Sequence, residues 1–293
     1  MSPKGRGSSF SEASKTVPPT PESHSSQSGR KVTTHSLQQM KEEGVPIAAL
    51  TAYDYLMAEM VDRAGIDLVL VGDSAAMVVQ GLDTTVTVTM DQMLYHAEIV
   101  SRAVNRALVV GDLPFMSFQV NPDEALRNAG LMVQKSGVEA VKLEGGTTIC
   151  PTVQRIVDVG IPVMGHLGLT PQSIHKFGTY QVRAKTDEEA EELRIDAQAL
   201  QDAGAFALVL EKVPAPLAAE VSQKLEIPVI GIGAGAGCDG QILVSHDMLG
   251  LYTRFKPRFV RRYGEMGQIM EEAFGRYLAD VRGRDFPGEE ESY

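Results

Sequence analysis

The chain has 293 residues, 43% of them hydrophobic and 22% charged, with a formal net charge of -11. This composition indicates a globular protein with a sizeable core, and the length allows one large domain or two medium ones. The acidic balance argues against nucleic acid or an anionic membrane as the main partner. Two distant cysteines, Cys150 and Cys238, exclude a disulfide framework and offer no zinc-binding spacing, so we expect a cytoplasmic protein.

Residues 1–30 are rich in Ser, Pro, Gly and Thr, and after Met1 only Phe10 and Val17 are bulky apolar side chains. Such a segment cannot bury enough apolar surface to offset its ordering entropy, so we predict a disordered tail. The N-terminus has no compact apolar stretch that would serve as a secretory signal. No apolar run in the chain reaches the roughly 18 residues of a membrane helix, so no membrane partner is expected.

From Lys31 onward, short apolar runs alternate with helix-like stretches. The apolarity of these runs is continuous rather than alternating, which predicts strands buried on both faces, as in a parallel sheet. The eight predicted strands are Ile47–Ala52, Leu68–Gly72, Ala107–Gly111, Ala140–Leu143, Pro162–Gly165, Ala207–Leu210, Pro228–Ile232 and Ile242–Val244.

Several intervening stretches carry the signals of helix ends. A helix over Asp91–Val104 would take Asp91 as its N-cap, and one over Pro122–Lys135 follows Asn121 with Pro at the first helical position. A third helix is predicted over Thr186–Ala203. Glycines after four helical stretches are predicted to adopt the left-handed conformation that leads from a helix into the next strand. They are Gly65, Gly137, Gly160 and Gly204.

Eight strands, most of them separated by helices, predict an α/β fold of the (β/α)8 TIM-barrel type. A doubly wound open sheet is the alternative, because the link between the last two strands is short for a barrel unit. We expect residues 31–283 to form one barrel domain, in which Phe259–Val281 forms a pair of C-terminal helices. Residues 284–293 are expected to form an acidic C-terminal tail.

Almost every predicted strand is followed by polar residues, and in a parallel barrel these strand ends converge on one rim. The polar residues at the strand ends are Thr51, Tyr53, Asp54, Asp73, Ser74, Asp112, Lys142, Glu144, His166, Glu211, His246 and Asp247. Any one of them could be an ordinary loop residue, but six or seven ionisable groups at one mouth indicate an active site.

Three carboxylates in this set would face each other across the mouth. Asp73, Asp112 and Glu144 would repel one another unless one is protonated, paired with a nearby Lys or Arg, or neutralised by a cation. Because the ligands are oxygen atoms, the expected cation is Mg2+. Lys142 points to the same side of the sheet as Glu144, either to bind an anionic substrate or as a structural ion pair. Glu211 follows an apolar run and is a candidate general base.

The glycine-rich run Gly231–Gly237 follows the seventh predicted strand. It is a poor dinucleotide fingerprint, because no ~30-residue βαβ unit with a downstream acidic residue follows it. It could bind phosphate, as late strands of many barrels do, or let the backbone approach a bulky ligand. Spacing leaves these two interpretations open.

Eight short motifs along the chain belong together. They are TAYD (Thr51–Asp54), VGDS (Val71–Ser74), DLPF (Asp112–Phe115), VKLEGG (Val141–Gly146), GHLGLTPQS (Gly165–Ser173), LVLE-VP (Leu208–Pro214), IPVIGIGAG (Ile227–Gly235) and DGQILV (Asp239–Val244). In this order, over roughly residues 31–255, they resemble the ketopantoate hydroxymethyltransferase family. The resemblance implies a TIM barrel of the phosphoenolpyruvate/pyruvate-binding superfamily.

The resemblance also implies a reaction and a site. The family transfers a hydroxymethyl group from 5,10-methylenetetrahydrofolate to 3-methyl-2-oxobutanoate in pantothenate biosynthesis, uses Mg2+, and forms homo-oligomers, often decamers. By position, Asp73, Asp112 and Glu144 match its metal site, and Glu211 matches its proposed catalytic base. The residues that match its substrate-binding site are Asp73, Ser74, Asp112, Lys142 and His166.

One segment departs from the family pattern. Gly178-Thr179-Tyr180 stands where the family often has two glycines, and QVRAKT (Gln181–Thr186) replaces its usual sequence. Both changes fall in a predicted mobile loop, so they bear on lid closure and folate contacts. The alternatives are an isocitrate-lyase-like enzyme, whose KKCGH loop is missing from this sequence, and a regulatory barrel that only binds a phosphorylated ligand.

Overall fold

The computed structural model describes residues 29–254 and 256–293, and its compact unit runs from Lys31 to Tyr293. The tail predicted for residues 1–30 therefore lies almost entirely outside the described residues. Of the helices in the described ranges, none is long and apolar enough to cross a bilayer.

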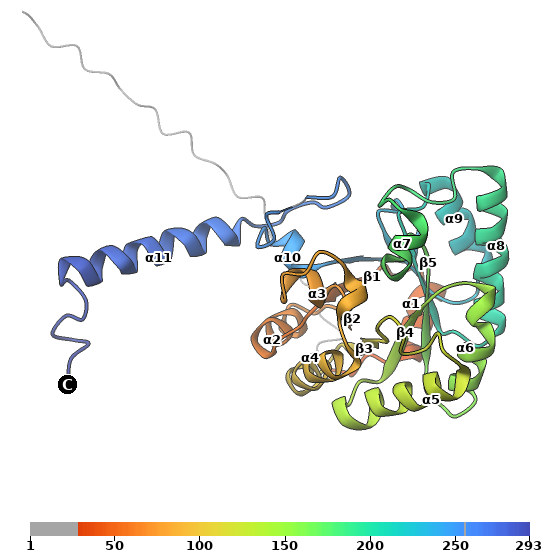
Figure 1. The fold of residues 1–293 in the computed structure, drawn as a ribbon, viewed down its shortest axis with the longest axis horizontal. Helices are drawn as coiled ribbons and strands as arrows, with labels where there is room; N and C mark the ends of the chain where they lie inside the picture. The colour runs from red at the N-terminus through yellow and green to blue at the C-terminus, as the bar shows by residue number, and fades with distance from the viewer. Residues whose placement is uncertain (1–28, 255) are drawn as a thin grey trace, which may run out of the picture. The chain divides into compact units, whose positions relative to one another are not determined.

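Eight parallel strands form a closed barrel in chain order (Figure 1). They are β1 (Ile47–Thr51), β2 (Leu68–Val71), β3 (Leu108–Asp112), β4 (Ala140–Glu144), β5 (Val163–Gly168), β6 (Ala207–Glu211), β7 (Val229–Ile232) and β8 (Gly240–Leu243). Each strand overlaps one of the predicted apolar runs, so the TIM-barrel prediction is confirmed.

The barrel closes between β8 and β1, where Gly240 pairs with Ile47. A glycine is needed at this point, because a Cβ on Gly240 would come within 2.5 Å of the Ile47 carbonyl oxygen. The loop of residues 233–239 joins β7 directly to β8 without a helix. The short link between the last two predicted strands was the reason to consider an open sheet. It is a direct β7–β8 connection within a closed barrel, so the open-sheet alternative is wrong.

Helices cover the outside of the barrel (Figure 1). The longer ones are α1 (Thr34–Glu42), α2 (Tyr55–Arg63), α4 (Met90–Ala103), α5 (Pro122–Leu131), α6 (Cys150–Val157), α8 (Asp187–Asp202) and α9 (Ala215–Lys224). Three short helices follow strand ends directly or after a short loop: α3 (Ala75–Val78), α7 (Ile174–Phe177) and α10 (Ser245–Met248). These short helices belong to the loops at the carboxyl ends of β2, β5 and β8.

Some helix ends differ from the predictions. Helix α4 begins at Met90, because Thr89 and Gln92 cap each other's backbone N–H groups, and Asp91 lies in the first turn instead of at the N-cap. Helix α5 is capped by Asn121 as predicted, but it ends at Leu131 and continues as a π-helical turn. The four glycines predicted to be left-handed all have positive φ.

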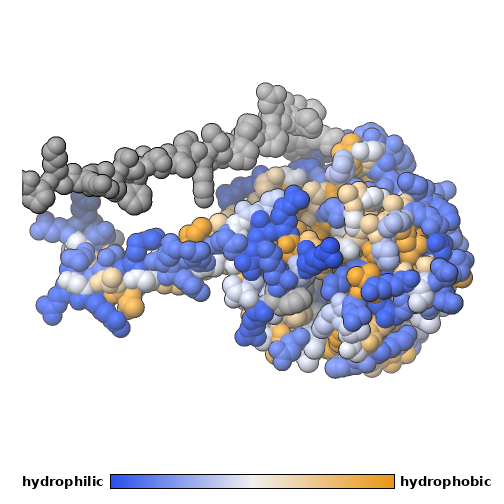
Figure 2. All heavy atoms as spheres, turned by 90° about the horizontal axis from the view of Figure 1, so that it is seen from above, coloured by the Kyte–Doolittle hydropathy of each residue, from blue (hydrophilic) through white to orange (hydrophobic). Residues whose placement is uncertain are grey.

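The predicted pair of helices over Phe259–Val281 is wrong, because one helix forms there, α11 (Met266–Gly283). Tyr263 N donates to Met248 O and Met266 N to Leu249 O, which fixes the preceding segment along α10 in a non-helical path. Helix α11 has no buried side chain. Apolar groups are visible in orange among its hydrophilic ones in Figure 2.

Two hydrophobic clusters pack on the two faces of the barrel wall. The larger lies between the strands and the outer helices, and the smaller fills the barrel interior. Burial on both faces explains why the strand sequences are continuously apolar. Toward the carboxyl ends of the strands, the interior cluster stops at Leu70, Val209 and Ile242, which form the floor of a cavity.

Candidate active site

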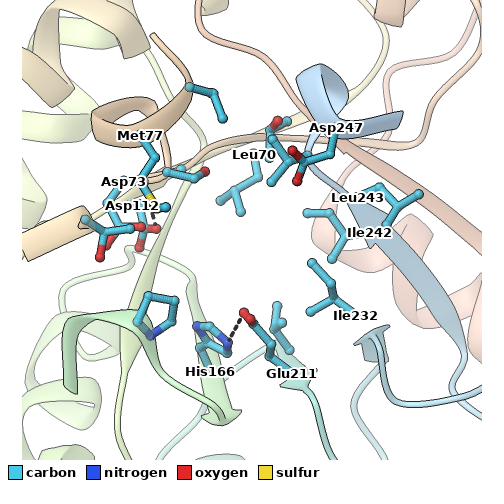
Figure 3. A pocket seen from close by; sticks show the side chains of 18 of the residues that line it. Leu70, Asp73, Met77, Asp112, His166, Glu211, Ile232, Ile242, Leu243 and Asp247 are labelled. Carbon is cyan, nitrogen blue, oxygen red and sulfur yellow. Dashed lines mark hydrogen bonds and ion pairs between the residues drawn. The ribbon is translucent and has the colours of Figure 1, made fainter. Parts of the chain in front are cut away.

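A cavity of about 210 Å3 lies at the carboxyl ends of the strands (Figure 3). The seven side chains predicted as site residues all line it. They are Asp73, Ser74, Asp112, Lys142, Glu144, His166 and Glu211. The structure therefore brings the predicted set together, while the chemical role of each residue stays a prediction.

Asp73 and Asp112 lie at the ends of the neighbouring strands β2 and β3. Asp73 N donates to Asp112 Oδ2 over 3.2 Å, and both side chains are buried. Burial and the neighbouring carboxylates Asp112 and Glu144 raise the pKa of Asp73 well above its ordinary value. Burial also raises the pKa of Asp112, although Lys142 acts against this effect. Ionising both carboxylates in this buried position is therefore unfavourable without a further positive charge.

Lys142 on β4 is a buried cation among these carboxylates. Its Nζ lies 3.0 Å from Asp112 Oδ1 and 3.6 Å from Glu144 Oε1. Burial acts to lower the pKa of Lys142, but Asp112, Glu144 and Asp73 outweigh it and raise this pKa. Lys142 therefore stays charged in the interior, where an unpaired ammonium would lose its proton.

A chain of contacts links β4, β5 and β6. Glu144 Oε1 lies 3.0 Å from His166 Nδ1, and His166 Nε2 lies 3.5 Å from Glu211 Oε2 (Figure 3). Burial acts to raise the pKa of Glu144, but Lys142 and His166 outweigh it and lower this pKa. Burial and Lys142 act to lower the pKa of His166, yet the two glutamates raise it to about 9. A protonated His166 therefore holds Glu211 beside the other polar groups.

Gln172 is a buried residue of this network that the sequence reasoning missed. Its Nε2 donates to Asp73 Oδ2 and to the Leu113 carbonyl oxygen, both over 3.0 Å, and its backbone N–H donates to Glu144 Oε2 over 3.0 Å. Gln172 lies within the GHLGLTPQS motif, but an uncharged side chain beyond a strand end gives no sign of such contacts. Its side chain and backbone bridge two of the predicted metal-site carboxylates.

The other half of the cavity is largely apolar. Leu70, Val209, Ile232 and Ile242 line it, and aromatic side chains also contribute to the cavity wall. Figure 3 shows Asp73 and Asp112 on one side of the space and the isoleucines with Asp247 on the other. The cavity therefore offers charged groups to one end of a ligand and a hydrophobic surface to the other.

The buried carboxylates suit a hard cation with oxygen ligands. Within residues 29–254 and 256–293, no three His, Cys, Asp or Glu side chains are already arranged around one metal position. Both oxygens of Glu144 accept hydrogen bonds, from His166 and from Gln172 N. Mg2+ in enzymes is commonly bound by one or two carboxylates together with substrate oxygens and water. Asp73 and Asp112, two neighbouring carboxylates that line the cavity, fit that pattern.

The glycine run after β7 packs against a helix. A Cβ on Gly235 would lie 2.4 Å from Ala215 Cβ, and one on Gly237 would lie 2.5 Å from Ala219 Cβ, both on α9. Of the run Gly231–Gly237, only Ile232 lines the cavity. The glycines therefore allow close packing of the β7–β8 loop on α9.

Comparisons with known proteins show the family to which the chain belongs. A family model described as ketopantoate hydroxymethyltransferase matches residues 31–289. A 3-methyl-2-oxobutanoate hydroxymethyltransferase of Salinibacter ruber is 60% identical over 263 residues, which are 90% of this chain and 99% of that protein.

Solved structures share the fold at low sequence identity. A phosphoenolpyruvate phosphomutase from Streptomyces platensis subsp. rosaceus is 17% identical with a TM-score of 0.60, covering 85% of this chain and 88% of that one. A 2,3-dimethylmalate lyase, described as a PEP mutase/isocitrate lyase superfamily member, is 21% identical with a TM-score of 0.59, covering 88% of this chain and 91% of that one. These likenesses support the (β/α)8 barrel fold.

Proposed function

The chain belongs to the ketopantoate hydroxymethyltransferase family, and we propose that it transfers a hydroxymethyl group from 5,10-methylenetetrahydrofolate to 3-methyl-2-oxobutanoate. The product is ketopantoate, an intermediate of pantothenate biosynthesis. The observation that carries the proposal is the 60% identity to a curated hydroxymethyltransferase over nearly its whole length. The cavity supports it, because one end is charged and the other is apolar, as a branched keto acid requires.

We assign the metal site to Asp73 and Asp112, with Glu144 beside it. Mg2+ bound there would act as a Lewis acid that polarises the keto group and makes the adjacent C–H more acidic. Because Glu144 is already engaged by His166 and Gln172, its contact to the cation is expected to run through water. The positive charge would also relieve the repulsion that raises the pKa of Asp73.

The remaining polar side chains would orient the keto acid. Lys142 supplies a fixed positive charge for its carboxylate and for the negative charge that develops on its keto oxygen. Ser74 offers a hydroxyl that is itself held by Tyr53 Oη over 2.7 Å. The isopropyl group would pack on the apolar floor, which leaves its C3–H toward Glu211.

Glu211 is the proposed general base. Its side chain is 15% exposed, whereas those of Asp112 and Glu144 are 1% and 3% exposed, so Glu211 is the one that a substrate can reach most easily. Water would hydrolyse the two C–N bonds of the folate methylene group and release formaldehyde and tetrahydrofolate. After Glu211 takes the C3 proton, the resulting carbanion would form the new C–C bond at the formaldehyde carbon. The alkoxide that results would take the proton back from Glu211 and become the hydroxymethyl group. His166 would keep the carboxylate of Glu211 in position during this step.

The proposal predicts that Glu211→Gln still binds the keto acid. The rate at which the C3 proton exchanges with D2O should fall at least about 100-fold. The exchange is followed by NMR without folate. Glu226→Gln, at an exposed position, is the matched control and should exchange like the wild type. Wild-type exchange in Glu211→Gln would remove this residue from the role of base.

The metal proposal has its own test. Protein treated with EDTA should form no ketopantoate, and added Mg2+ should restore turnover. Full activity after complete metal removal would contradict the assignment of Asp73 and Asp112 as a metal site. Folded protein without product under any metal condition would contradict the proposed function itself.

We also propose a homo-oligomer, a decamer by family resemblance, located in the cytoplasm. Side chains such as Ile269, Phe274 and Tyr277 on α11 are more than half exposed, and large apolar groups on one helix favour contact with another protein surface. Light scattering on the purified chain would measure the mass, and a monomer would contradict this proposal.

A further inference from the structure

Asp247 differs from the other carboxylates of the cavity. It lies in α10 just after β8, on the side of the cavity away from Asp73 and Asp112 (Figure 3). Asp73, Asp112 and Glu144 each accept a hydrogen bond of 3.2 Å or less. Asp247 has no hydrogen-bond or ion-pair partner among the described residues, because nearby Arg262 instead contacts Glu265 over 3.0 Å.

The carboxylate of Asp247 lies partly buried in the cavity wall without a polar contact from the described part of the chain. Burial raises the pKa of Asp247 to about 6, and Arg262 only partly opposes the effect. The carboxylate is half-buried and receives donors from solvent instead of from the described residues, so a ligand that brings N–H groups would pair with it without displacing a protein contact. Thr85, another residue of the cavity wall, has an Oγ1 atom that is buried and has no hydrogen-bond partner among the described residues.

The keto acid is not a suitable ligand for Asp247. 3-Methyl-2-oxobutanoate is an anion without an N–H or O–H group at neutral pH, so Asp247 would repel it. Its charged end has other partners across the cavity, where Lys142 is fixed. Asp247 must therefore face the second substrate, or a part of the cavity that no substrate enters.

We propose that Asp247 is a specificity-determining residue that binds the aminopyrimidinone edge of the pterin ring of the one-carbon donor. This edge carries an amino group beside a ring N–H, two parallel donors that match the two oxygens of a carboxylate. The aromatic rings of Tyr180 and Tyr252 also line the cavity and offer flat surfaces to a flat heterocycle. The proposal rests on the proposed function, because it assumes a folate as co-substrate.

Asp247→Asn tests the proposal, since it keeps the shape but replaces one acceptor oxygen by a donor. We expect kcat/KM for 5,10-methylenetetrahydrofolate to fall about 10-fold to 100-fold, mainly through KM, which is the usual loss for a hydrogen bond to a charged group. Deuterium exchange at C3 of the keto acid needs no folate and should stay within about twofold of wild type. That exchange also shows that the variant is folded.

Asp83→Asn is the control for charge. Asp83 is exposed and lies two residues before Thr85, so this variant removes one negative charge near the cavity without touching the proposed contact. Folates are anions, so loss of a negative charge by itself should leave KM unchanged or lower it. Specific recognition by Asp247 instead predicts that the folate KM rises in Asp247→Asn.

An altered ligand gives a second, independent test. The second test uses a methylenetetrahydrofolate analogue that carries a methyl group in place of the pterin 2-amino group. With this analogue, kcat/KM of the wild type should exceed that of Asp247→Asn by much less than it does with the natural folate. An unchanged or lower folate KM in Asp247→Asn, or loss of keto-acid exchange together with folate use, would overturn the proposal. A wild type that shows neither exchange nor turnover would instead refute the proposed function.

Discussion

The two halves of the cavity differ in polarity and in how their charged side chains are paired. On the side of β2 to β5, Asp112, Lys142 and Glu144 are almost fully buried and connected by hydrogen bonds and ion pairs. On the side of β7 and β8, the wall is apolar, and its carboxylate Asp247 has no partner among the described residues. The first half is held together by contacts within the protein, whereas the carboxylate of the second half is left for the proposed contact with the one-carbon donor.

This difference has a physical cause. Charges that must act on developing negative charge are most effective when their positions are fixed in advance, which requires burial and mutual pairing. Such networks are costly to bury and depend on every member. A wall that receives a hydrophobic group or a large second substrate needs shape and a few polar contacts instead. Substitutions in the two halves should therefore fail in different ways.

The largest effect is expected for Lys142→Met in the connected half. Removing this cation leaves Asp73, Asp112 and Glu144 buried with less compensation, so we expect about 3–5 kcal/mol lower stability and at least about 1000-fold lower turnover. Chemical denaturation and the product assay measure the two effects. Lys135→Met, at an exposed position, is the matched control. Near-normal stability in Lys142→Met would mean that the buried network is not coupled as the distances indicate.

A smaller effect is expected for Val209→Thr in the apolar half. The substitution keeps the shape but places a hydroxyl where the substrate methyl groups would pack, so KM for the keto acid should rise about 10-fold with little change in kcat. Val110→Thr is the control, because Val110 lies in the barrel interior but does not line the cavity. A KM increase of the same size in both variants would show that stability, and not substrate packing, causes it.

The smallest effect concerns the folded protein without ligand. Since the pKa of Asp247 is raised to about 6, the folded state holds this proton more tightly than the unfolded state. The contribution of Asp247 to stability is therefore fully present below its ordinary pKa of 3.8 and is lost as the pH rises through about 6. Asp247→Asn should unfold roughly 2–4 °C above wild type at pH 7, the shift that about 1 kcal/mol causes in domains of similar size.

The pH dependence separates this explanation from a general effect of charge. The difference between Asp247→Asn and wild type should shrink toward zero below pH 3.8, where the aspartate is mostly protonated in the folded and the unfolded chain. Asp83→Asn should show no comparable gain at pH 7, because Asp83 is exposed. A destabilised Asp247→Asn at pH 7 would indicate that the carboxylate supports the free fold, contrary to the contrast between the two halves.

Much of this protein follows from its sequence. Continuous apolar runs marked all eight strands, because strands of a central parallel barrel are buried on both faces. The same regularity placed the ionisable residues at strand ends, and a parallel barrel turns strand ends into one rim. Asp73, Asp112, Lys142 and Glu211 could thus be named before any coordinates, and the motifs around them identified the family.

Only the tertiary structure decided which side chains contact one another and which are buried. The contacts of Gln172 with Asp73 and Glu144 join residues far apart in the chain, and an amide gives no sequence signal of such a role. The glycine run after β7, a candidate ligand loop by sequence, serves close packing on α9. Asp247 was one polar residue among many at the rim, and only the cavity shows that it lacks a partner. Sequence records which groups are present, but pairing and burial depend on the whole fold, and these set the charge of each group.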